Sequence, residues 1–334
     1  MKQKCIVGFL FLCILFIIIS CVGCGETVEF PPQPGEAGPA DNKEIQKPVN
    51  IGVLQGPTGM GIVHLMDDSN YNIEIVGSPD VLIGKIVTGE VDLAAVPSNL
   101  AAILYERSGQ KIELLAINTL GVLYVLEDGK EVNSIADLAG KTLYVSGKGA
   151  TPDFAIQYLL KKHGLEVGKD VILDFSTQHA DLASMLVAGR HDLALLPQPH
   201  VTSVLMQNQN FRIALDLTKE WKGVTGSELP MGVIVAQKEF IENNKDALLT
   251  FLEKYEQSIQ LVNNNIAKSA ALIAEHNILP NPEVAEQAIP FCNIVYIDAA
   301  NGRAYLEDFF NILFEFSPDS IGGKIPDDGF YFVP

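Results

Sequence analysis

One stretch of the sequence occurs twice, one hundred residues apart, and it constrains the fold more than any other feature. Residues 87–97, VTGEVDLAAVP, return as residues 187–197, VAGRHDLALLP, with Val, Gly, Asp, Leu, Ala and Pro in the same places. Each copy has the pattern of a helix end, a Gly suited to positive φ, a short buried strand and a Pro that ends it. Two copies indicate two similar α/β lobes. The cleft between hinged lobes is a common place for a small ligand.

The size and charge of the chain narrow the possible partners. Its 334 residues, 48% of them hydrophobic, are enough for two hydrophobic cores. The formal net charge is −18, and no Lys/Arg-rich run occurs. A polyanion would therefore be repelled, and nucleic acid is not expected as a partner.

The N-terminal residues have the pattern of an export signal. Lys2 and Lys4 precede an apolar stretch that ends at Ser20-Cys21. The stretch is short for a membrane-spanning helix, although that interpretation stays open. We expect residues 1–23 to be a lipoprotein signal peptide, with Cys21 as the lipidated residue and Cys24 as the alternative. Residues 24–47, rich in Pro, Gly and charge, are expected to form a flexible tether.

Strands alternate with helices in both halves, which predicts two α/β lobes, each with a mostly parallel sheet and flanking helices. The apolar run 112–126, interrupted near residue 120, is expected to leave the first lobe and enter the second, and residues 231–236 to return. The helical pattern from residue 240 onward is expected to pack back on lobe one. The predicted domains are residues 48–119 with 237–334 as lobe one and residues 120–236 as lobe two, joined by a two-strand hinge.

Loops that follow the strands hold the candidate ligand-binding residues, because open α/β sheets bind ligands at the carboxyl ends of their strands. Several candidates also have purely structural roles. Ser98, Asn99 and Thr151 suit helix N-caps, and Trp221 suits either a cleft wall or a buried anchor. His200 also falls on a predicted cleft loop. The candidates are Thr58, Gly59, Ser98, Asn99, Lys148, Gly149, Thr151, His179, Gln198 and Trp221.

The charge of the ligand stays open at this point. Gly147 and Gly149 would let backbone N–H groups face an anion, with Lys148 supplying positive charge at the start of a helix. The acidic body is equally compatible with a cationic heterocycle stacked on Trp221. An anion and a cation are therefore both possible occupants.

Motifs for catalysis, metals and cofactors are absent from the sequence. There is no P-loop, no zinc-ligand spacing and no Gly-x-Ser-x-Gly nucleophile elbow. Cys292 is the only cysteine in the folded body, and burial is the expected state of such a thiol. We therefore expect neither catalytic residues nor a metal or other cofactor, and the protein is expected not to be an enzyme.

Three segments resemble the substrate-binding proteins of bacterial ABC importers, in the branch that binds sulfonates, nitrate, taurine and thiamine precursors. Residues 134–142, SIADLAGKT, look like that group's entry to the second lobe. Gly189 followed by Asp192 resembles its Gly-x-x-Asp element, and residues 263–271 resemble its late helical hairpin. The resemblance implies a type II periplasmic-binding-protein fold whose lobes close on a solute and dock on a permease.

What the resemblance implies is an exported lipoprotein, anchored to the outer face of the cytoplasmic membrane. It would deliver a small organic solute, such as a sulfonate, a nitrate-like ion or a thiamine precursor, to an ABC permease and its ATPase. Thr58, Ser98, Thr151 and His179 would then be the clamping residues. The alternatives are a secreted ligand-sensing module and an enzyme similar to the thiamine-pyrimidine synthases, whose cysteine cluster this chain lacks.

Overall fold

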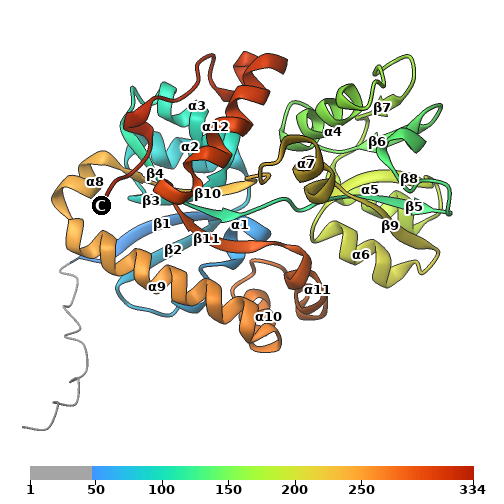
Figure 1. Cartoon of the computed structure of the whole chain (residues 1–334). Helices are drawn as coiled ribbons and strands as arrows, with labels where there is room; N and C mark the ends of the chain where they lie inside the picture. The colour runs from blue at the N-terminus through green and yellow to red at the C-terminus, as the bar shows by residue number, and fades with distance from the viewer. Residues whose placement is uncertain (1–46) are drawn as a thin grey trace, which may run out of the picture. The chain divides into compact units, whose positions relative to one another are not determined.

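The computed structural model describes residues 47–334, which contain two β-sheets flanked by helices (Figure 1). The expected signal peptide, all but the last residue of the expected tether, and both candidate lipidation sites, Cys21 and Cys24, lie outside the described residues. The strands are β1 (Val49–Leu54), β2 (Tyr71–Val76), β3 (Leu93–Pro97), β4 (Ile112–Thr119), β5 (Leu123–Asp128), β6 (Thr142–Val145), β7 (Ile172–Asp174), β8 (Leu193–Pro197), β9 (Phe211–Asp216), β10 (Gly232–Gln237) and β11 (Ile294–Asp298).

The two sheets repeat one strand order. The first sheet runs β2-β1-β3-β10-β4 with β11 added at its edge, and the second runs β7-β6-β8-β5-β9. The duplicated strands β3 and β8 take the same central place in the two sheets. The expectation of two similar lobes from the repeated sequence is therefore confirmed.

Each sheet contains one strand that directly follows a connection from the other lobe. Strand β5 lies antiparallel between β8 and β9, and β10 lies antiparallel between β3 and β4. The strand pairing is consequently less parallel than expected, because β5 and β10 each run opposite to both of their neighbours. Residues 232–236 belong to the first sheet, although the predicted lobe boundary placed them in lobe two.

Helices cover both faces of each sheet, and their bounds follow the sequence pattern closely. They are α1 (Pro57–Met60), α2 (Pro79–Thr88), α3 (Ser98–Arg107), α4 (Thr151–Lys162), α5 (His179–Val187), α6 (His200–Gln207), α7 (Leu217–Thr225), α8 (Lys238–Asn243), α9 (Lys245–Asn264), α10 (Ile266–Glu275), α11 (Pro282–Ala288) and α12 (Ala299–Phe316). Short 3-10 turns span Val63–Leu65, Ile135–Leu138, Ile289–Phe291, Pro318–Ile321 and Asp328–Phe330.

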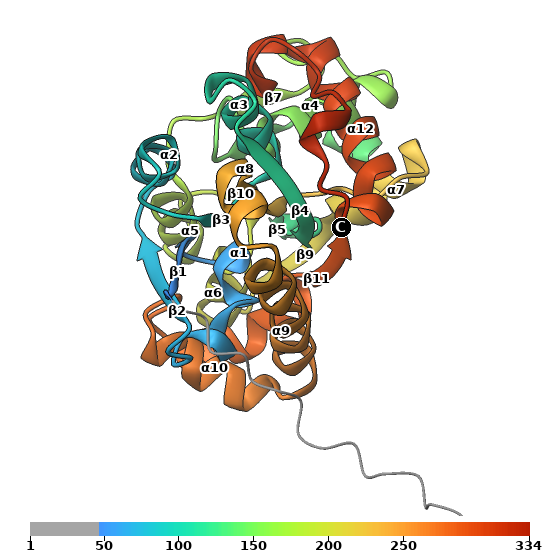
Figure 2. The ribbon, with the colours of Figure 1, turned by 90° about the vertical axis from the view of Figure 1, so that its left-hand side faces the viewer.

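The C-terminal helices return to the first sheet as expected. Helices α9 and α10 lie on one side of it and α3 and α12 on the other (Figure 2). The helical pattern expected from residue 240 onward is interrupted at Asn244, whose φ of −135° and ψ of 38° separate α8 from α9. Burial alternates along β3, where Leu93 and Ala95 face one core and Ala94 and Val96 face the other.

The two glycines of the repeat have the backbone conformation that the sequence predicts. Gly89 follows α2 with φ of 74°, and Gly189 follows α5 with φ of 66°. Both values lie in the left-handed region, which costs a residue with a side chain more than glycine. In each lobe this glycine directs the chain from the helix into the central strand.

One apolar cluster extends across both lobes. It joins the α2, α3 and α12 side of the first sheet to the α4 and α7 side of the second. Trp221 on α7 is 1% exposed and lies between Tyr158 on α4 and Phe309 on α12, with ring centroids 5.1 and 6.0 Å away. The candidate role of Trp221 as a cleft wall is wrong, because α12 covers the indole from a segment far along the chain.

The aromatic contact between the lobes makes a testable prediction. Phe309→Ala opens a cavity beside Trp221 and should lower the free energy of unfolding by about 3–5 kcal/mol. Phe314 lies on the same helix, is 38% exposed, and provides the matched control. Phe314→Ala should cost clearly less, because little buried contact is lost. Urea unfolding followed by circular dichroism measures both, and equal losses would show that the cluster contributes no more than an exposed ring.

Candidate ligand-binding site

A cavity of about 600 Å³ lies between the two sheets, at the ends of strands β1, β3, β6 and β8. Both lobes contribute to its wall, and the connections that lead into β5 and β10 complete it. The lining residues are Gln55, Gly56, Pro57, Thr58, Pro79, Pro97, Asn99, Leu100, Thr119, Val122, Ala150, Thr151, Pro152, His179, Pro197, Gln198, Pro199, His200, Met231, Ile278, Leu279 and Pro280. The volume is in the range usual for small organic ligands.

The repeat brings equivalent residues to the two sides of this cavity. Ser98 follows β3, and its backbone N–H donates to the carbonyl of Met231 at 3.1 Å. Gln198 follows β8, and its backbone N–H donates to the carbonyl of Val122 at 2.9 Å. Each bond ties the end of a central strand to the crossing strand beside it. Ser98 Oγ and Gln198 Nε2 are both buried without a hydrogen-bond partner among the described residues.

Two histidines from the second lobe lie next to each other in the wall. The rings of His179 and His200 are stacked with centroids 5.6 Å apart. His179 Nδ1 shares a hydrogen bond with Ser146 Oγ, which fixes the orientation of the ring. Burial lowers the pKa of His179. Burial, and next the neighbouring His179, lower the pKa of His200 to about 4. Both imidazoles are therefore neutral near pH 7.

Five of the ten candidate residues line the cavity: Thr58, Asn99, Thr151, His179 and Gln198. Their roles in helix capping differ from those expected. Thr151 is the first residue of α4, and Ala150 precedes it as the cap without a side-chain hydrogen bond. Ser98 likewise begins α3 after Pro97. An N-cap residue stands just before the first residue of a helix, whereas Ser98 and Thr151 are themselves the first residues of α3 and α4. Neither hydroxyl therefore caps its helix.

The other five candidates do not line the cavity, and each has a structural contact instead. Gly59 is buried against β1, where a Cβ atom would lie 2.3 Å from the carbonyl oxygen of Leu54. Ser98 is fully buried behind the wall. Lys148 Nζ lies 5.9 Å from the centre of the Phe175 ring. The Gly149 N–H donates to the Asp153 carboxylate at 2.9 Å. Trp221 belongs to the apolar cluster between the lobes.

Sequence reasoning missed one part of the wall entirely. The segment Ile278–Pro280 between α10 and α11 lines the cavity, and the carbonyl of Ile278 accepts from the Gly56 N–H at 3.3 Å. No strand precedes this segment, so the rule that ligands bind after strands did not find it. The hydrogen bond at Gly56 depends on a contact between residues more than two hundred positions apart, which no local pattern shows.

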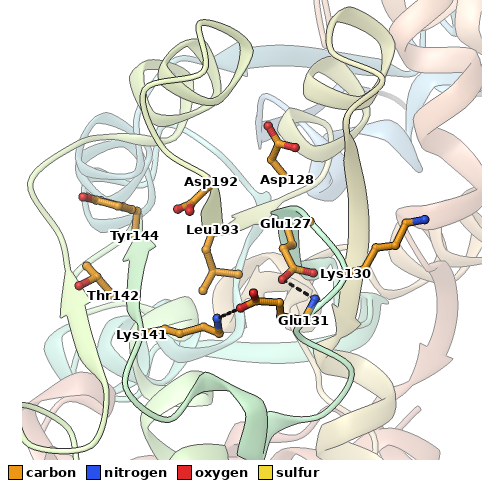
Figure 3. Close-up of a pocket in the computed structure, with 10 residues that line it drawn as sticks. Glu127, Asp128, Lys130, Glu131, Lys141, Thr142, Tyr144, Asp192 and Leu193 are labelled. Carbon is orange, nitrogen blue, oxygen red and sulfur yellow. Dashed lines mark hydrogen bonds and ion pairs between the residues drawn. The ribbon is translucent and has the colours of Figure 1, made fainter.

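A second cavity, of about 430 Å³, lies beside the end of β5 and the starts of β6 and β8 (Figure 3). It is rich in charge, and part of this charge is paired. Glu127 accepts from Arg212 at 2.6 Å and from the backbone N–H groups of Glu131 and Val132. Lys141 pairs with Glu131 at 2.5 Å. These contacts hold the loop after β5, and the cavity lies at the opposite ends of β6 and β8 from the first cavity.

Within residues 47–334 there is no indication of a metal site, a reactive cysteine or a membrane-spanning helix. No group of three or more His, Cys, Asp or Glu side chains there has a metal-binding arrangement. Cys292 is fully buried, and burial raises the pKa of its thiol, so the reactive thiolate is disfavoured. None of the helices in this part of the chain has the length and apolar character to cross a membrane.

Solved structures with the same arrangement define the fold class. A structure described as an ABC transporter from Parabacteroides distasonis has a TM-score of 0.74 and 24% identity, covering 86% of this chain and 99% of that one. The periplasmic aliphatic sulphonate binding protein SsuA of Escherichia coli has a TM-score of 0.68 and 17% identity, covering 86% and 92%. This protein therefore has the two-lobed periplasmic-binding-protein fold, and the expected fold class is confirmed.

Sequence comparison gives the family. The chain belongs to the family described as "Menaquinone biosynthesis", whose model matches residues 60–320. A relative from Bacillus subtilis (strain 168), the binding protein YtlA, is 23% identical over 215 residues, which are 63% of this chain. The chain matches only 62% of the length of YtlA. At these identities the solved structures establish the fold only. The nature of the ligand has to be inferred from the residues that line the cavity.

The low pKa of His200 predicts a pH-dependent loss of stability. In the unfolded chain this imidazole takes a proton below its ordinary pKa of 6.5, whereas in the folded protein it does so only near pH 4. The stabilisation is complete above pH 6.5 and is lost as the pH falls toward 4, by about 3 kcal/mol in total.

The variant His200→Gln should therefore lose less stability than the wild type between pH 6.5 and pH 4. Urea unfolding at a series of pH values measures the difference, and the His200 ring resonances in an NMR titration give the pKa directly. The same pH dependence in the variant and the wild type would contradict the assignment.

Proposed function

We propose that this protein is the extracytoplasmic substrate-binding component of an ABC importer. It would bind a small organic solute between its lobes and present it to a membrane permease. The observation that carries the proposal is the cavity of about 600 Å³, whose wall is built jointly by the two lobes. A solute that touches both lobes favours the closed arrangement over the open one, and this coupling is what a carrier that signals its loaded state requires.

Two hydroxyl side chains support this two-sided binding. Thr58 lies on α1 of the first lobe, and Thr151 begins α4 of the second. Both line the cavity, and neither side chain is used as a helix cap. We infer that they hydrogen-bond one solute from the two lobes, and His179 lines the same cavity.

The double variant Thr58→Ala/Thr151→Ala tests this arrangement. Mass spectrometry of the solute that copurifies with the protein first identifies the ligand. Isothermal titration calorimetry of that solute into protein freed of bound solute should then show at least tenfold weaker binding in the double variant. The reason is the loss of two hydrogen bonds, worth about 1 kcal/mol each. Thr88→Ala, on the exposed part of α2, is the control and should bind as the wild type does. Unchanged affinity in the double variant would remove both residues from the site.

Membrane anchoring is part of the proposal and rests on the sequence. We infer that Cys21 carries the lipid, so that residues 24–47 hold the lobes near the permease on the outer face of the cytoplasmic membrane. Cys21→Ser should abolish incorporation of labelled palmitate and release the protein from the membrane fraction, whereas Cys24→Ser should change neither. The reverse pattern would assign the lipid to Cys24, and labelling of both variants would contradict lipid anchoring at either residue alone.

An enzyme on the same fold is the second candidate. The family description is that of a biosynthetic step, and the cavity holds His179 with its ring oriented by Ser146. A neutral, oriented imidazole is a suitable general base. Incubating the stripped protein with its copurified solute and analysing the mixture by mass spectrometry separates the two functions. A carrier returns the solute unchanged, and an enzyme yields product in excess of protein.

A further inference from the structure

We propose that the cavity between the lobes selects an uncharged solute, which accepts a hydrogen bond from the side-chain amide of Gln198. This inference deepens the proposed function and rests on it. It differs from what the sequence left open, where an anion at the Gly147–Thr151 loop and a cation beside Trp221 were both possible.

The wall of the cavity contains no ionised side chain. None of the described residues that line it is Lys, Arg, Asp or Glu. Its only titratable side chains are His179 and His200, both neutral near pH 7 because burial disfavours their charged forms. A charged solute would lose its hydration there without meeting an opposite charge, which is costly.

Several backbone N–H groups at the expected anion site are already occupied. The Gly149 N–H donates to the Asp153 carboxylate, so the protein supplies its own anion at the start of α4. The Gly56 N–H donates to Ile278, and the Ala150 N–H donates to the carbonyl of Gly147. Prolines remove further donors, because Pro57, Pro79 and Pro152 each stand in the first turn of a helix that begins at the cavity.

The cavity also lacks the groups that would bind a cation. The aromatic side chain expected to stack on it, Trp221, is buried between α7, α4 and α12 and does not line the wall. No carboxylate of the described lining offers a counter-charge. The nearby Asp153 is already hydrogen-bonded to Gly149 and to Gln157 Nε2, at 2.9 and 2.5 Å.

Gln198 supplies the positive argument. Its side chain is 2% exposed and lines the cavity. Thr202 fixes its orientation, because the Thr202 hydroxyl and backbone N–H both donate to Gln198 Oε1, at 2.8 and 3.3 Å. A backbone N–H can only donate, so the amide cannot be turned the other way round. Gln198 Nε2 then stays buried without a partner among the described residues.

A buried N–H donor without a partner is unfavourable, and a solute that accepts from it relieves the penalty. The matching group is a neutral carbonyl oxygen or ring nitrogen. The remainder of the solute would pack on the apolar wall formed by Val122, Met231, Ile278 and Leu279, beside the imidazole rings of His179 and His200. The chemical class is thus a small, uncharged, partly apolar molecule with an acceptor at one end.

Pairs of probes with the same shape and different charge test the inference. Benzenesulfonamide is compared with benzenesulfonate, nicotinamide with nicotinate and benzamide with benzoate, and sodium nitrate is added as a small anion. Thermal shift and isothermal titration on the stripped wild-type protein should show binding of uncharged members, at least tenfold tighter than their charged partners. Tighter binding of the charged members, or binding by none of the uncharged ones, overturns the inference.

Variants of Gln198 locate the contact. Gln198→Glu keeps the acceptor that Thr202 uses and replaces the donor by an acceptor, so it should weaken binding of the uncharged probe at least tenfold. Gln198→Met removes the donor without adding charge and should also weaken it. Gln207→Glu, the same substitution at the exposed end of α6, is the control and should bind as the wild type does. Thermal unfolding confirms that each variant is folded, and full affinity in both Gln198 variants would overturn the assignment.

The outcome for the solute that copurifies separates this inference from the proposed function. A charged copurifying solute, bound in the cavity and released unchanged, would overturn the preference for uncharged molecules and leave solute capture standing. Conversion of the solute to product would overturn the proposed role as a carrier. The role of Gln198 would then still be tested by the binding measurements on the Gln198 variants.

Discussion

The structure depends on two connections that cross between the lobes, each of which leads into a strand in the interior of the sheet it enters. Strand β5 lies between β8 and β9, and β10 lies between β3 and β4. Each of these strands is held by hydrogen-bond ladders on both sides, so each connection between the lobes is anchored in the interior of the sheet it enters. The crossings enter beside Val122 and Met231, which both line the cavity. The same connections therefore join the lobes and form part of the ligand site.

The repeated sequence explains why the site is two-sided. In each lobe a helix, a left-handed glycine and a central strand deliver a short loop to the cavity. The loops have diverged in their side chains: the first lobe buries Ser98 behind the wall, whereas the second places Gln198 in it. A duplicated scaffold with different loop residues gives two walls of similar position and different chemistry, which suits an asymmetric solute.

Much of the fold was predictable from the sequence, because hydrophobic periodicity and the glycine positions are local properties. The break near residue 120 and the returning strand were found in this way. Strand β9 was missed although Phe211, Ile213 and Leu215 alternate along it. Residue roles were harder to predict where they depend on distant contacts. Trp221 is covered by α12, about ninety residues further along the chain, and Ile278 reaches Gly56 across most of the sequence.

Trp221 has a further consequence, since it is the single tryptophan of the chain and lies where α7 of one lobe meets α12 of the other. Indole fluorescence depends on the polarity and packing around the ring, so the emission of the unmodified protein reports on this contact alone. Rotation of one lobe against the other changes the surroundings of the indole, and solute binding can then be followed optically, in solution and in real time, without any attached dye.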